Sequence, residues 1–579
     1  MYFFRAIFTP LFMSYFFFHT IATSADVERF DVSVELARGY LGIPHDGVFF
    51  ADEFVNAFIR VSEPATGRDR NTTRITATVS IMSTDKSFYR VLLSENQFEN
   101  LPARTSDGHF ETWHLCNFFL PGTDTLSEGK YILHFDIQNV AQSNLRIVVE
   151  REINIVPAGT IGANLLAFAM VHTNIKEAKG SDVLHQQAPI FTLGSTYTPA
   201  LLYRFSEACH ENDDFIAMVT ILRYDDKMIV NAAQQMPVPK NGETGFLWLP
   251  LSAPGKFKIR IDGLDKKNEK KFYYELPYVV VDEIQLLDFL GRRELQASLM
   301  MGKSPEPVID LMLTKGVYTM EPLDKVLPGE RFTAVLCIHN LPIQDFREEP
   351  YFTPRISISL FGGDLRYDYL KEHMARPKFS GISPDTKTAF VRLLGPVDIP
   401  GNEVLPPGKY SLEIEVVRTE DETKRGTSMP IEILPANTIG ILTAAFFEMG
   451  SVIAPLHMEK DKDRIFYKPP VFTAKGNNRV FFLTTINTGN LKAENVAVYV
   501  EQLDLEGKTV SEFPVDFPVS IQPRPNRISA LIPVMTAIPG KYKIRVVVED
   551  RTTGQQNISD FPLIVLDAEK ELSFISQEY

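Results

Sequence analysis

The chain has 579 residues, of which 44% are hydrophobic and 23% are charged, and its formal net charge is −14. This length exceeds what one hydrophobic core holds, and a domain size of about 150 residues predicts about four domains. The ordinary composition excludes a largely disordered chain. The acidic balance disfavours nucleic acid and anionic membranes as partners, because both call for a basic surface.

The first 25 residues differ from the rest of the chain. Arg5 is their only charge, the stretch 7–18 is almost wholly apolar, and small residues precede Asp26. A short apolar run that ends in small residues is typical of a secretory signal peptide. The alternative is an uncleaved N-terminal anchor, although the run is short for a bilayer span. We therefore predict an exported chain, periplasmic or extracellular, with no transmembrane segment after the signal peptide.

One turn-and-strand pattern occurs four times along the chain. Its clearest copy is the stretch 539–550, in which apolar and polar residues alternate after a Pro-Gly turn. Alternation with a period of two predicts a β-strand with one buried face and one solvated face. The other copies begin at Gly129, Gly255 and Gly408. Four copies predict an all-β chain of four similar domains.

The four copies form two pairs. The stretch 155–162 returns at 433–440, displaced by 278 positions, and the stretch 255–260 returns at 540–545, displaced by 285. A slowly drifting displacement is what a duplication followed by small loop insertions leaves behind. The sequence therefore predicts a duplicated two-domain unit.

The tail of the second domain also matches the tail of the fourth, with Leu287 aligned to Leu572. Helix-forming residues continue from there toward Ser304, which predicts a short connecting helix near 283–303. We expect the joint between the two halves to act as a hinge.

The matches also predict the domain limits. These are a signal peptide at 1–25, sandwich A at 26–157, sandwich B at 158–288, a connector at 289–303, sandwich A′ at 304–435, sandwich B′ at 436–567 and a C-terminal tail at 568–579. Pro157 and Pro435 at the boundaries predict stiff junctions, which favour a rod or a curved string. Cys116, Cys209 and Cys337 fall in different domains, so no domain closes an internal disulfide.

The last two strands of each domain are predicted to form a hairpin. The closing strand carries a proline in three copies, at Pro277, Pro430 and Pro562. We expect these prolines at an edge or at the first position of the strand, where the missing N–H costs nothing. Many short strands at this spacing favour a sandwich over a barrel.

The step Tyr542-Lys543-Ile544 resembles strand F of an immunoglobulin domain, with an aliphatic residue in place of the cysteine. The resemblance implies an immunoglobulin-like sandwich with the aromatic ring at the corner position. Phe257 lacks a hydroxyl, so a corner hydrogen bond cannot be general. The stretches 485–490 and 493–500 look like CARDB-type modules of bacterial exported or surface proteins, and the Pro-Gly-Lys-Tyr turn is similar to macroglobulin-like domains. These resemblances imply a fold and no particular activity.

Two tryptophans, Trp113 and Trp248, precede their Gly-Lys turns by comparable distances. We expect them to pack in a core or between sheets, with a sugar-stacking platform as the alternative. The stretch 209–214 is the densest cluster of metal-capable side chains. It lacks the partner spacing of a zinc site, so we predict a solvated loop, with a metal site at Cys209 and His210 as the alternative.

Other motif fragments do not reach a catalytic pattern. Gly507-Lys508-Thr509 ends like a phosphate-binding loop, but Gln502 replaces the first glycine, so we predict a hairpin turn. The stretch 31–35 lacks the second serine of a D-x-S-x-S metal site and predicts a first strand. We therefore expect no enzyme activity, no catalytic, cofactor-binding or metal-binding residue, and no cofactor.

These observations favour an exported, non-enzymatic scaffold or protein-interaction and adhesion protein. Its expected partner is another exported or surface protein, bound at strand edges or at the loops of one sandwich end. The alternative is a carbohydrate- or cell-wall-binding accessory protein, in which Trp248 or exposed tyrosines stack on sugar rings.

Overall fold

The computed structural model is built from four immunoglobulin-like sandwiches, each of which packs a four-stranded sheet on a five-stranded sheet. It describes residues 30–574 except for 38–44, 46, 65–72, 101–102, 105–108, 141–144, 173–183, 187, 194–196, 211–213, 225–228, 241–242, 250–253, 288–307, 324, 343–354, 363–364, 375–378, 384–387, 418–423, 450–465, 475–478, 514–526 and 537. The predicted signal peptide at 1–25 and connector at 289–303 lie outside the described residues. Among those that are described, no helix is long and apolar enough to span a membrane.

Sandwich A contains β1 to β9. Its four-stranded sheet has the order β1 (Asp31–Ala37), β3 (Phe54–Pro64), β7 (His109–Phe119), β6 (Ala103–Arg104). Its five-stranded sheet has the order β2 (Val48–Phe49), β9 (Arg146–Ile155), β8 (Gly129–Asn139), β4 (Thr73–Ser83), β5 (Tyr89–Asn100). Apolar side chains that alternate along both sheets, such as Val55, Ile81 and Phe135, fill the core between them.

Sandwich B contains β10 to β18 and a short helix. Its four-stranded sheet has the order β11 (Leu184–Gln186), β10 (Ala163–His172), β13 (Tyr197–Phe205), β16 (Gly245–Trp248). Its five-stranded sheet has the order β12 (Ile190–Thr192), β18 (Lys270–Val281), β17 (Gly255–Asp265), β14 (Phe215–Arg223), β15 (Ile229–Met236). The helix α2 (Glu207–His210) follows β13, and α3 (Glu283–Leu287) follows β18.

Sandwich A′ contains β19 to β27. Its four-stranded sheet has the order β19 (Val308–Lys315), β21 (Arg331–Pro342), β25 (Thr388–Asp398), β24 (Phe379–Ser383). Its five-stranded sheet has the order β20 (Lys325–Val326), β27 (Lys424–Ile433), β26 (Gly408–Val417), β22 (Arg355–Gly362), β23 (Leu365–Met374).

Sandwich B′ contains β28 to β36. Its four-stranded sheet has the order β29 (Phe466–Tyr467), β28 (Gly440–Met449), β31 (Arg479–Asn487), β34 (Arg527–Val534). Its five-stranded sheet has the order β30 (Val471–Thr473), β36 (Gln556–Leu566), β35 (Gly540–Asp550), β32 (Val496–Asp504), β33 (Thr509–Phe513). A 3₁₀ turn, η3 (Ala493–Asn495), precedes β32, and α4 (Ala568–Leu572) follows β36.

All four sandwiches share the topology of the five-stranded sheet. In the four-stranded sheet the short strand differs: β6 and β24 pair with β7 and β25 in A and A′, whereas β11 and β29 pair with β10 and β28 in B and B′. A short strand near the start of each, β2, β12, β20 or β30, pairs in parallel with the last strand. The repeated turn-and-strand pattern forms β8, β17, β26 and β35, one at the centre of each five-stranded sheet. Along β35 the alternate residues from Tyr542 to Val548 are buried, as the period of two predicts. The predicted all-β, immunoglobulin-like fold is therefore confirmed.

The corner position behaves as the sequence predicts. The Tyr131, Tyr410 and Tyr542 hydroxyls each donate to a backbone carbonyl four residues upstream, at 3.1, 2.8 and 3.1 Å respectively. Phe257 has no hydroxyl, and its ring stacks on the Tyr278 ring with a centroid separation of 4.8 Å. The hydrogen bond is therefore present in three sandwiches and is replaced by ring packing in B.

The closing strands begin earlier than predicted. Pro277, Pro430 and Pro562 lie inside β18, β27 and β36, because the polar loops before them are shorter than expected. The expectation of a first position was therefore wrong. In β18 the parallel neighbour β12 pairs only from Val279 onward, so Pro277 precedes that pairing.

The two sandwiches of each half meet at equivalent glycines. A side chain at Gly162 would overlap the Phe50 ring, whose Cζ lies 2.2 Å from the position of a Cβ. The corresponding Gly440 would bring a Cβ to 3.0 Å from Leu327 Cδ1. Both glycines close the matched stretches found in the sequence, so the duplication preserves the A–B junction as well as the strands.

The helix α4 of the second half packs into the first half. It lies in an apolar cluster that joins sandwiches A and B, which we call the α4 cluster. Its buried members are Ala37, Phe58, Trp113, Leu115, Ala188, Ile190, Val279, Ala568, Leu572 and Phe574. Asp567 caps the helix by accepting from the backbone N–H groups of Glu569 and Lys570.

The helix α3 of the first half packs into the second half in the same way. The α3 cluster joins it to sandwiches A′ and B′, and its buried members are Ile284, Leu287, Tyr318, Met320, Val335, Val471 and Ile564. Asp282 caps α3 by accepting from the N–H groups of Ile284 and Gln285. Val281 and Leu566, which are equivalent residues, pack against both clusters. The contact between halves is therefore reciprocal, as in a two-fold symmetric dimer.

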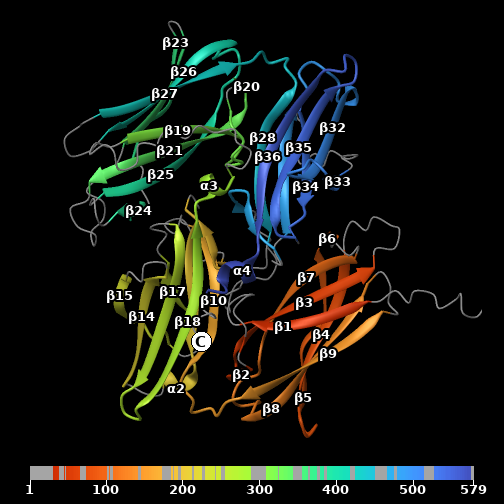
Figure 1. Ribbon diagram of the computed structural model, residues 1–579, viewed down its shortest axis with the longest axis vertical. Helices are drawn as coiled ribbons and strands as arrows, with labels where there is room; N and C mark the ends of the chain where they lie inside the picture. The colour runs from red at the N-terminus through yellow and green to blue at the C-terminus, as the bar shows by residue number, and fades with distance from the viewer. Residues whose placement is uncertain are drawn as a thin grey trace, which may run out of the picture.

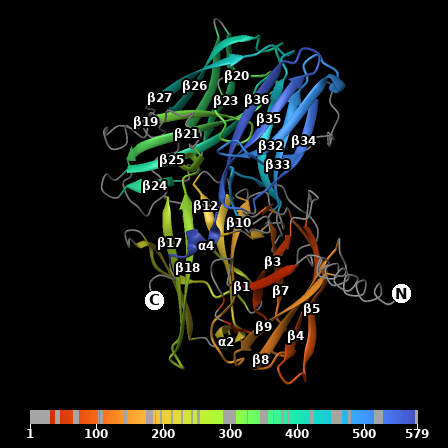
Figure 2. The ribbon, with the colours of Figure 1, turned by 45° about the vertical axis from the view of Figure 1, so that its right-hand side comes forward.

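The reciprocal contact overturns the expected rod. The four sandwiches lie two by two around α3 and α4, with A beside B and A′ beside B′ (Figures 1 and 2). The helix α3 occupies the first residues of the predicted connecting helix near 283–303, and its apolar side is buried; residues 288–303 lie outside the described residues. A rod would leave Leu287 and Leu572 in water, so hydrophobic burial favours the closed arrangement.

Candidate interaction surfaces

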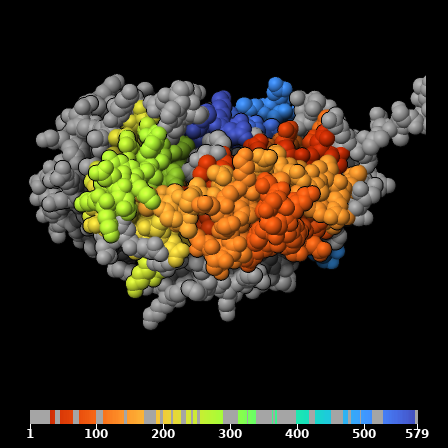
Figure 3. All heavy atoms as spheres, turned by 90° about the horizontal axis from the view of Figure 1, so that it is seen from below, coloured from red at the N-terminus to blue at the C-terminus, as the bar shows by residue number. Residues whose placement is uncertain are grey.

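Three aromatic rings are exposed near the junction of sandwiches A and B. Phe119 is 38% exposed, Phe246 is 42% exposed and Trp248 is 44% exposed. We call these three residues the aromatic junction face. Sandwiches A and B lie side by side on one face of the molecule (Figure 3). Neighbouring exposed apolar side chains can mark a contact surface, whereas single exposed apolar residues are common on any protein.

The edge position of β16 places two of the rings outside the core. Phe246 pairs with Leu202 and Trp248 pairs with Ala200, so both rings project to the outer face of the four-stranded sheet. The rings stack with an interplanar angle of 19° and a centroid separation of 6.4 Å. Among the described strands, β16 pairs only with β13.

A buried arginine supports the third ring. The Arg204 guanidinium lies 5.4 Å from the centroid of the Phe119 ring, which also packs on Phe54 at 5.1 Å. Phe54 contacts the apolar patch that includes Ala200 and Leu202, the strand partners of Trp248 and Phe246. Apolar packing therefore connects the rings across the domain junction.

Hydrogen bonds fix Arg204 in this position. Its Nε donates to Asn164 Oδ1 at 3.0 Å, and its Nη2 donates to the Asp52 carbonyl at 2.6 Å. Its Nη2 also lies 3.1 Å from Asp52 Oδ2. Burial raises the pKa of the Asp52 carboxyl and outweighs the opposing effect of Arg204. Arg204, against the Phe119 ring, is thus held by hydrogen bonds to residues of both sandwiches.

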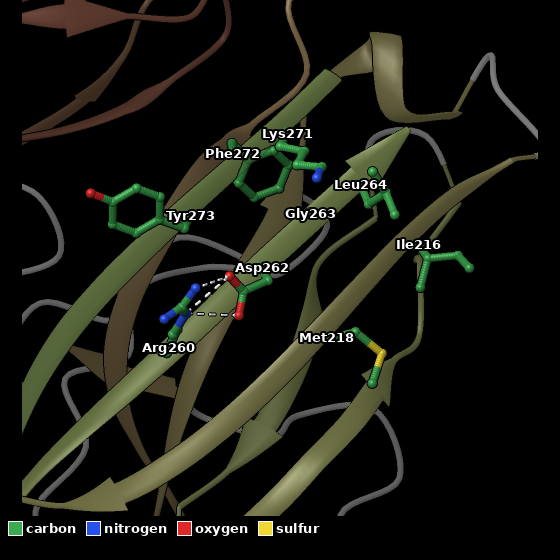
Figure 4. Close-up of a pocket in the computed structure, with 9 residues that line it drawn as sticks. All are labelled: Ile216, Met218, Arg260, Asp262, Gly263, Leu264, Lys271, Phe272 and Tyr273. Carbon is green, nitrogen blue, oxygen red and sulfur yellow. Dashed lines mark hydrogen bonds and ion pairs between the residues drawn. The ribbon is translucent and has the colours of Figure 1, made fainter. Parts of the chain in front are cut away.

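A second surface lies on the outer face of the five-stranded sheet of B. A hollow of about 390 Å³ is lined by Ile216, Met218, Arg260, Asp262, Gly263, Leu264, Lys271, Phe272 and Tyr273 (Figure 4). Arg260 donates from Nε to both Asp262 oxygens, at 3.0 and 2.9 Å, and this bond raises the arginine pKa. The guanidinium also lies 5.8 Å from the Tyr273 ring centroid. The hollow therefore combines an apolar floor with a charged and aromatic rim.

The two tryptophans have different environments. Trp113 is 3% exposed and belongs to the α4 cluster, as expected for a packing residue. Trp248 is exposed, so the expectation that it packs in a core was wrong. The edge strand β16 turns alternate residues outward, and sequence spacing alone did not indicate on which face the tryptophan lies.

Cys209 was expected in a solvated loop, and that expectation was also wrong. The residue lies in α2 and is 2% exposed within the core of sandwich B. Burial raises the pKa of its thiol. Residues 211–213 of the proposed metal cluster lie outside the described residues. Where the chain is described, no three His, Cys, Asp or Glu side chains gather as metal ligands would.

The other motif fragments are structural. Gly507 lies in the turn between β32 and β33 with φ of +83°, and Lys508 N donates to Asp504 Oδ1 at 2.8 Å. The stretch 31–35 lies in the first strand, β1. Cys116 is buried in the core of A, and burial raises the pKa of its thiol to about 12. These fragments are therefore structural, whereas the aromatic junction face and the hollow are open to solvent.

No protein-family model matches the chain, and no curated protein matches its sequence. Among solved structures, a tetra-tandem repeat from the extending region of a large adhesion protein matches with 9% identity over 93% of this chain and 100% of that one, at a TM-score of 0.14. A D1–D4 ectodomain fragment of ICAM-5 matches with 9% identity over 93% and 100%, at 0.13. Salmonella alpha-2-macroglobulin matches with 11% identity over 93% and 40%, at 0.15. Scores this low support no inference about arrangement or activity.

Proposed function

We propose that the chain is an exported, non-enzymatic interaction protein whose aromatic junction face binds a partner protein. The observation that carries this proposal is the exposure of Phe119, Phe246 and Trp248 at a junction whose buried Arg204 is hydrogen-bonded to both sandwiches. Tryptophan and other aromatic residues anchor many protein interfaces, because a stiff ring buries a large area at little entropic cost. β16 is an edge strand among the described strands, and its outer edge would add backbone hydrogen bonds to an extended partner segment.

A pull-down of the exported protein with mild crosslinking tests the proposal. The double variant Phe246→Ala/Trp248→Ala should lose the partner that the unchanged chain captures. The matched control is Tyr89→Ala, which removes an exposed ring, 62% accessible, from β5 of sandwich A, away from β16 of sandwich B. Equal capture by the double variant, or an unchanged chain that captures nothing above background, would refute the proposal.

Carbohydrate binding is a second candidate, and the stacked pair on β16 favours it. Sugar rings bind to exposed aromatic faces, and Phe246 and Trp248 present two rings at a small interplanar angle. A glycan array probed with the unchanged chain and with Trp248→Ala decides between the candidates. Binding that depends on Trp248 supports a glycan ligand, whereas an empty array leaves the protein partner.

We infer that the predicted domain limits, 26–157, 158–288, 304–435 and 436–567, bound four folding units. The separate apolar core of each sandwich supports this inference. Limited proteolysis with mass spectrometry should find the early cleavage sites between these limits, and early cleavage within a core strand would contradict it.

A further inference from the structure

Positive charge is concentrated on the β17–β18 hairpin of sandwich B. Between residues 256 and 271 the chain has seven Lys and Arg residues and three Asp and Glu residues, a net charge of +4 in a chain of −14. Lys266, Lys267, Lys270 and Lys271 are all exposed at the hairpin tip. Asp265 accepts from the N–H groups of Lys267 and Asn268, which fixes the turn. The tip therefore presents lysines from an ordered turn.

The hollow lies directly beside this charged tip. Ile216 pairs with Leu264, and Leu264 pairs with Lys271, so the apolar floor and a lysine share one row of the sheet. In the next row, Met218, Asp262 and Tyr273 are neighbours. Tyr273 is 57% exposed at the rim (Figure 4). A single large apolar side chain could enter between these rows while acidic neighbours remain near the lysines.

The duplicated sandwich B′ lacks this combination at the equivalent positions. Its hairpin tip, residues 551–555, carries one basic residue, Arg551. The row equivalent to Met218, Asp262 and Tyr273 consists of Tyr499, Val547 and Ile558. Lys543 and Arg545 of B′ both contact one carboxylate, Asp560, at 3.1 and 2.8 Å. The basic tip and the hollow have thus diverged between B and B′ on a shared scaffold.

We propose that the outer face of the β17–β18 hairpin binds an acidic peptide segment of a partner protein, with one apolar side chain in the hollow. This inference rests on the proposed interaction function and names a second contact surface for it. Carboxylates of the segment would lie against Lys266, Lys267 and Lys271, and a leucine or phenylalanine would contact Met218 and Leu264. Charge complementarity speeds association and selects the partner, while the apolar anchor supplies affinity. The carboxylates of Asp262, Glu269 and Glu275 interrupt the basic surface and disfavour a continuous phosphate backbone.

Fluorescence anisotropy with the full chain tests this proposal. The probe is a labelled peptide with one leucine flanked on both sides by glutamates, and it should bind saturably and more weakly as salt is raised. Replacing its leucine by serine should weaken binding about tenfold, which is the loss of about 1.4 kcal/mol of apolar burial. Equal affinity of the serine peptide would overturn the apolar anchor and with it the proposal.

Variants of the chain locate the binding surface. The triple variant Lys266→Gln/Lys267→Gln/Lys271→Gln and the variant Tyr273→Ser should each weaken peptide binding at least about tenfold. The matched control is Ile558→Ser in B′, at the position equivalent to Tyr273, and it should bind like the unchanged chain. All these side chains are exposed, so circular dichroism should show an unchanged fold.

Two further outcomes separate the explanations. A random-sequence DNA oligonucleotide or an anionic phospholipid vesicle that binds as tightly as the peptide would show unspecific polyanion binding and overturn the proposal. The variant Phe246→Ala/Trp248→Ala should retain peptide binding. If that variant loses the crosslinked partner while the unchanged chain binds no acidic peptide, the hairpin inference fails and the aromatic junction face stands.

Discussion

Leu287 and Leu572 occupy equivalent positions 285 residues apart, and each is buried in the half of the chain to which it does not belong. Each residue lies in a short helix that an aspartate caps, and each is 1% exposed. Because the two contacts are reciprocal, loosening either one exposes apolar surface in both halves. We therefore expect the association of the two halves to contribute strongly to the stability of the whole chain.

Cutting the connector should leave the two halves together. We predict that a specific protease site inserted within 289–303 yields two fragments that co-elute in size-exclusion chromatography, because the α3 and α4 clusters hold them without the covalent link. The fragments should separate only in denaturant. Separation of the fragments in native buffer would show that the reciprocal contacts are too weak to join the halves.

Shortening Leu572 should destabilise the chain. We predict that Leu572→Ala lowers the free energy of unfolding by about 2–5 kcal/mol, since it opens a cavity in the α4 cluster. Urea denaturation measures the change. The control Lys570→Ala alters an exposed residue of the same helix and should change stability by less than about 0.5 kcal/mol. Similar effects of both variants would contradict the packing role of Leu572.

Gly316 is predicted to be irreplaceable for a reason beyond its dihedral angle. Its φ is +68°, and a Cβ would lie 2.0 Å from the Ala444 carbonyl oxygen in sandwich B′. That carbonyl accepts from Val317 N at 2.6 Å, so it is not free to move. Gly554 has a similar φ of +72°, and a Cβ there would meet no other atom. The control Gly554→Ala should therefore lower the free energy of unfolding by only about 1–2 kcal/mol. Gly316→Ala should cost roughly 2 kcal/mol more in urea denaturation.

Removing the corner hydroxyl should have the same small effect in three sandwiches. We predict that Tyr131→Phe, Tyr410→Phe and Tyr542→Phe each lower stability by about 1 kcal/mol, because each leaves a backbone carbonyl without its donor. Thermal unfolding of the three variants compares them directly. No loss in any of the three would indicate that water replaces the hydroxyl without cost.

Glu330 should make stability depend on pH. Burial raises the pKa of its carboxyl from 4.5 to about 7, against the opposing effects of Lys315 and of the Leu327 N–H. A folded-state pKa above the unfolded value means that the folded chain holds the proton more tightly. Its contribution to stability is therefore full below about pH 4.5 and is lost as pH rises through about 7.

The variant Glu330→Gln tests this dependence. Its stability in urea should lack the decline of about 3 kcal/mol that the unchanged chain shows across that pH range through this group. The equivalent Glu53 is the control. It accepts from Phe50 N at 2.7 Å and lies 2.8 Å from His45 Nε2, so Glu53→Gln should lose stability instead. An identical pH profile for Glu330→Gln and the unchanged chain would contradict the prediction.

The sequence predicted the strands well because the information for them is local. Alternation around Tyr542 and the Gly-Lys turns identified the central strand of each sandwich, and the duplication paired the domains. The closing strand of sandwich B was predicted to begin at Pro277, which was wrong by several residues, because the sequence carries no sharp signal for the end of a polar loop. The connecting helix near 283–303 was predicted from composition, and the structure describes only its first part, where α3 lies at Glu283–Leu287.

The arrangement of the sandwiches and the surfaces could not be predicted in the same way. The alignment of Leu287 with Leu572 indicated that both tails belong to the duplicated unit. No local sequence pattern shows that each tail packs into the other half. Trp248 and Trp113 have similar sequence contexts, yet one lies on an edge strand and the other beneath α4. The lysines within 266–271 can be read from the sequence. The hollow beside them could not be predicted, because it depends on how three strands pair.

The reciprocal packing of α3 and α4 affects how the association of the two halves depends on protein concentration. Two identical subunits joined by such a contact would dissociate on dilution, whereas the same contact within one polypeptide has a fixed effective concentration. Fusion also frees each copy to change alone, because a substitution no longer appears twice in the assembly.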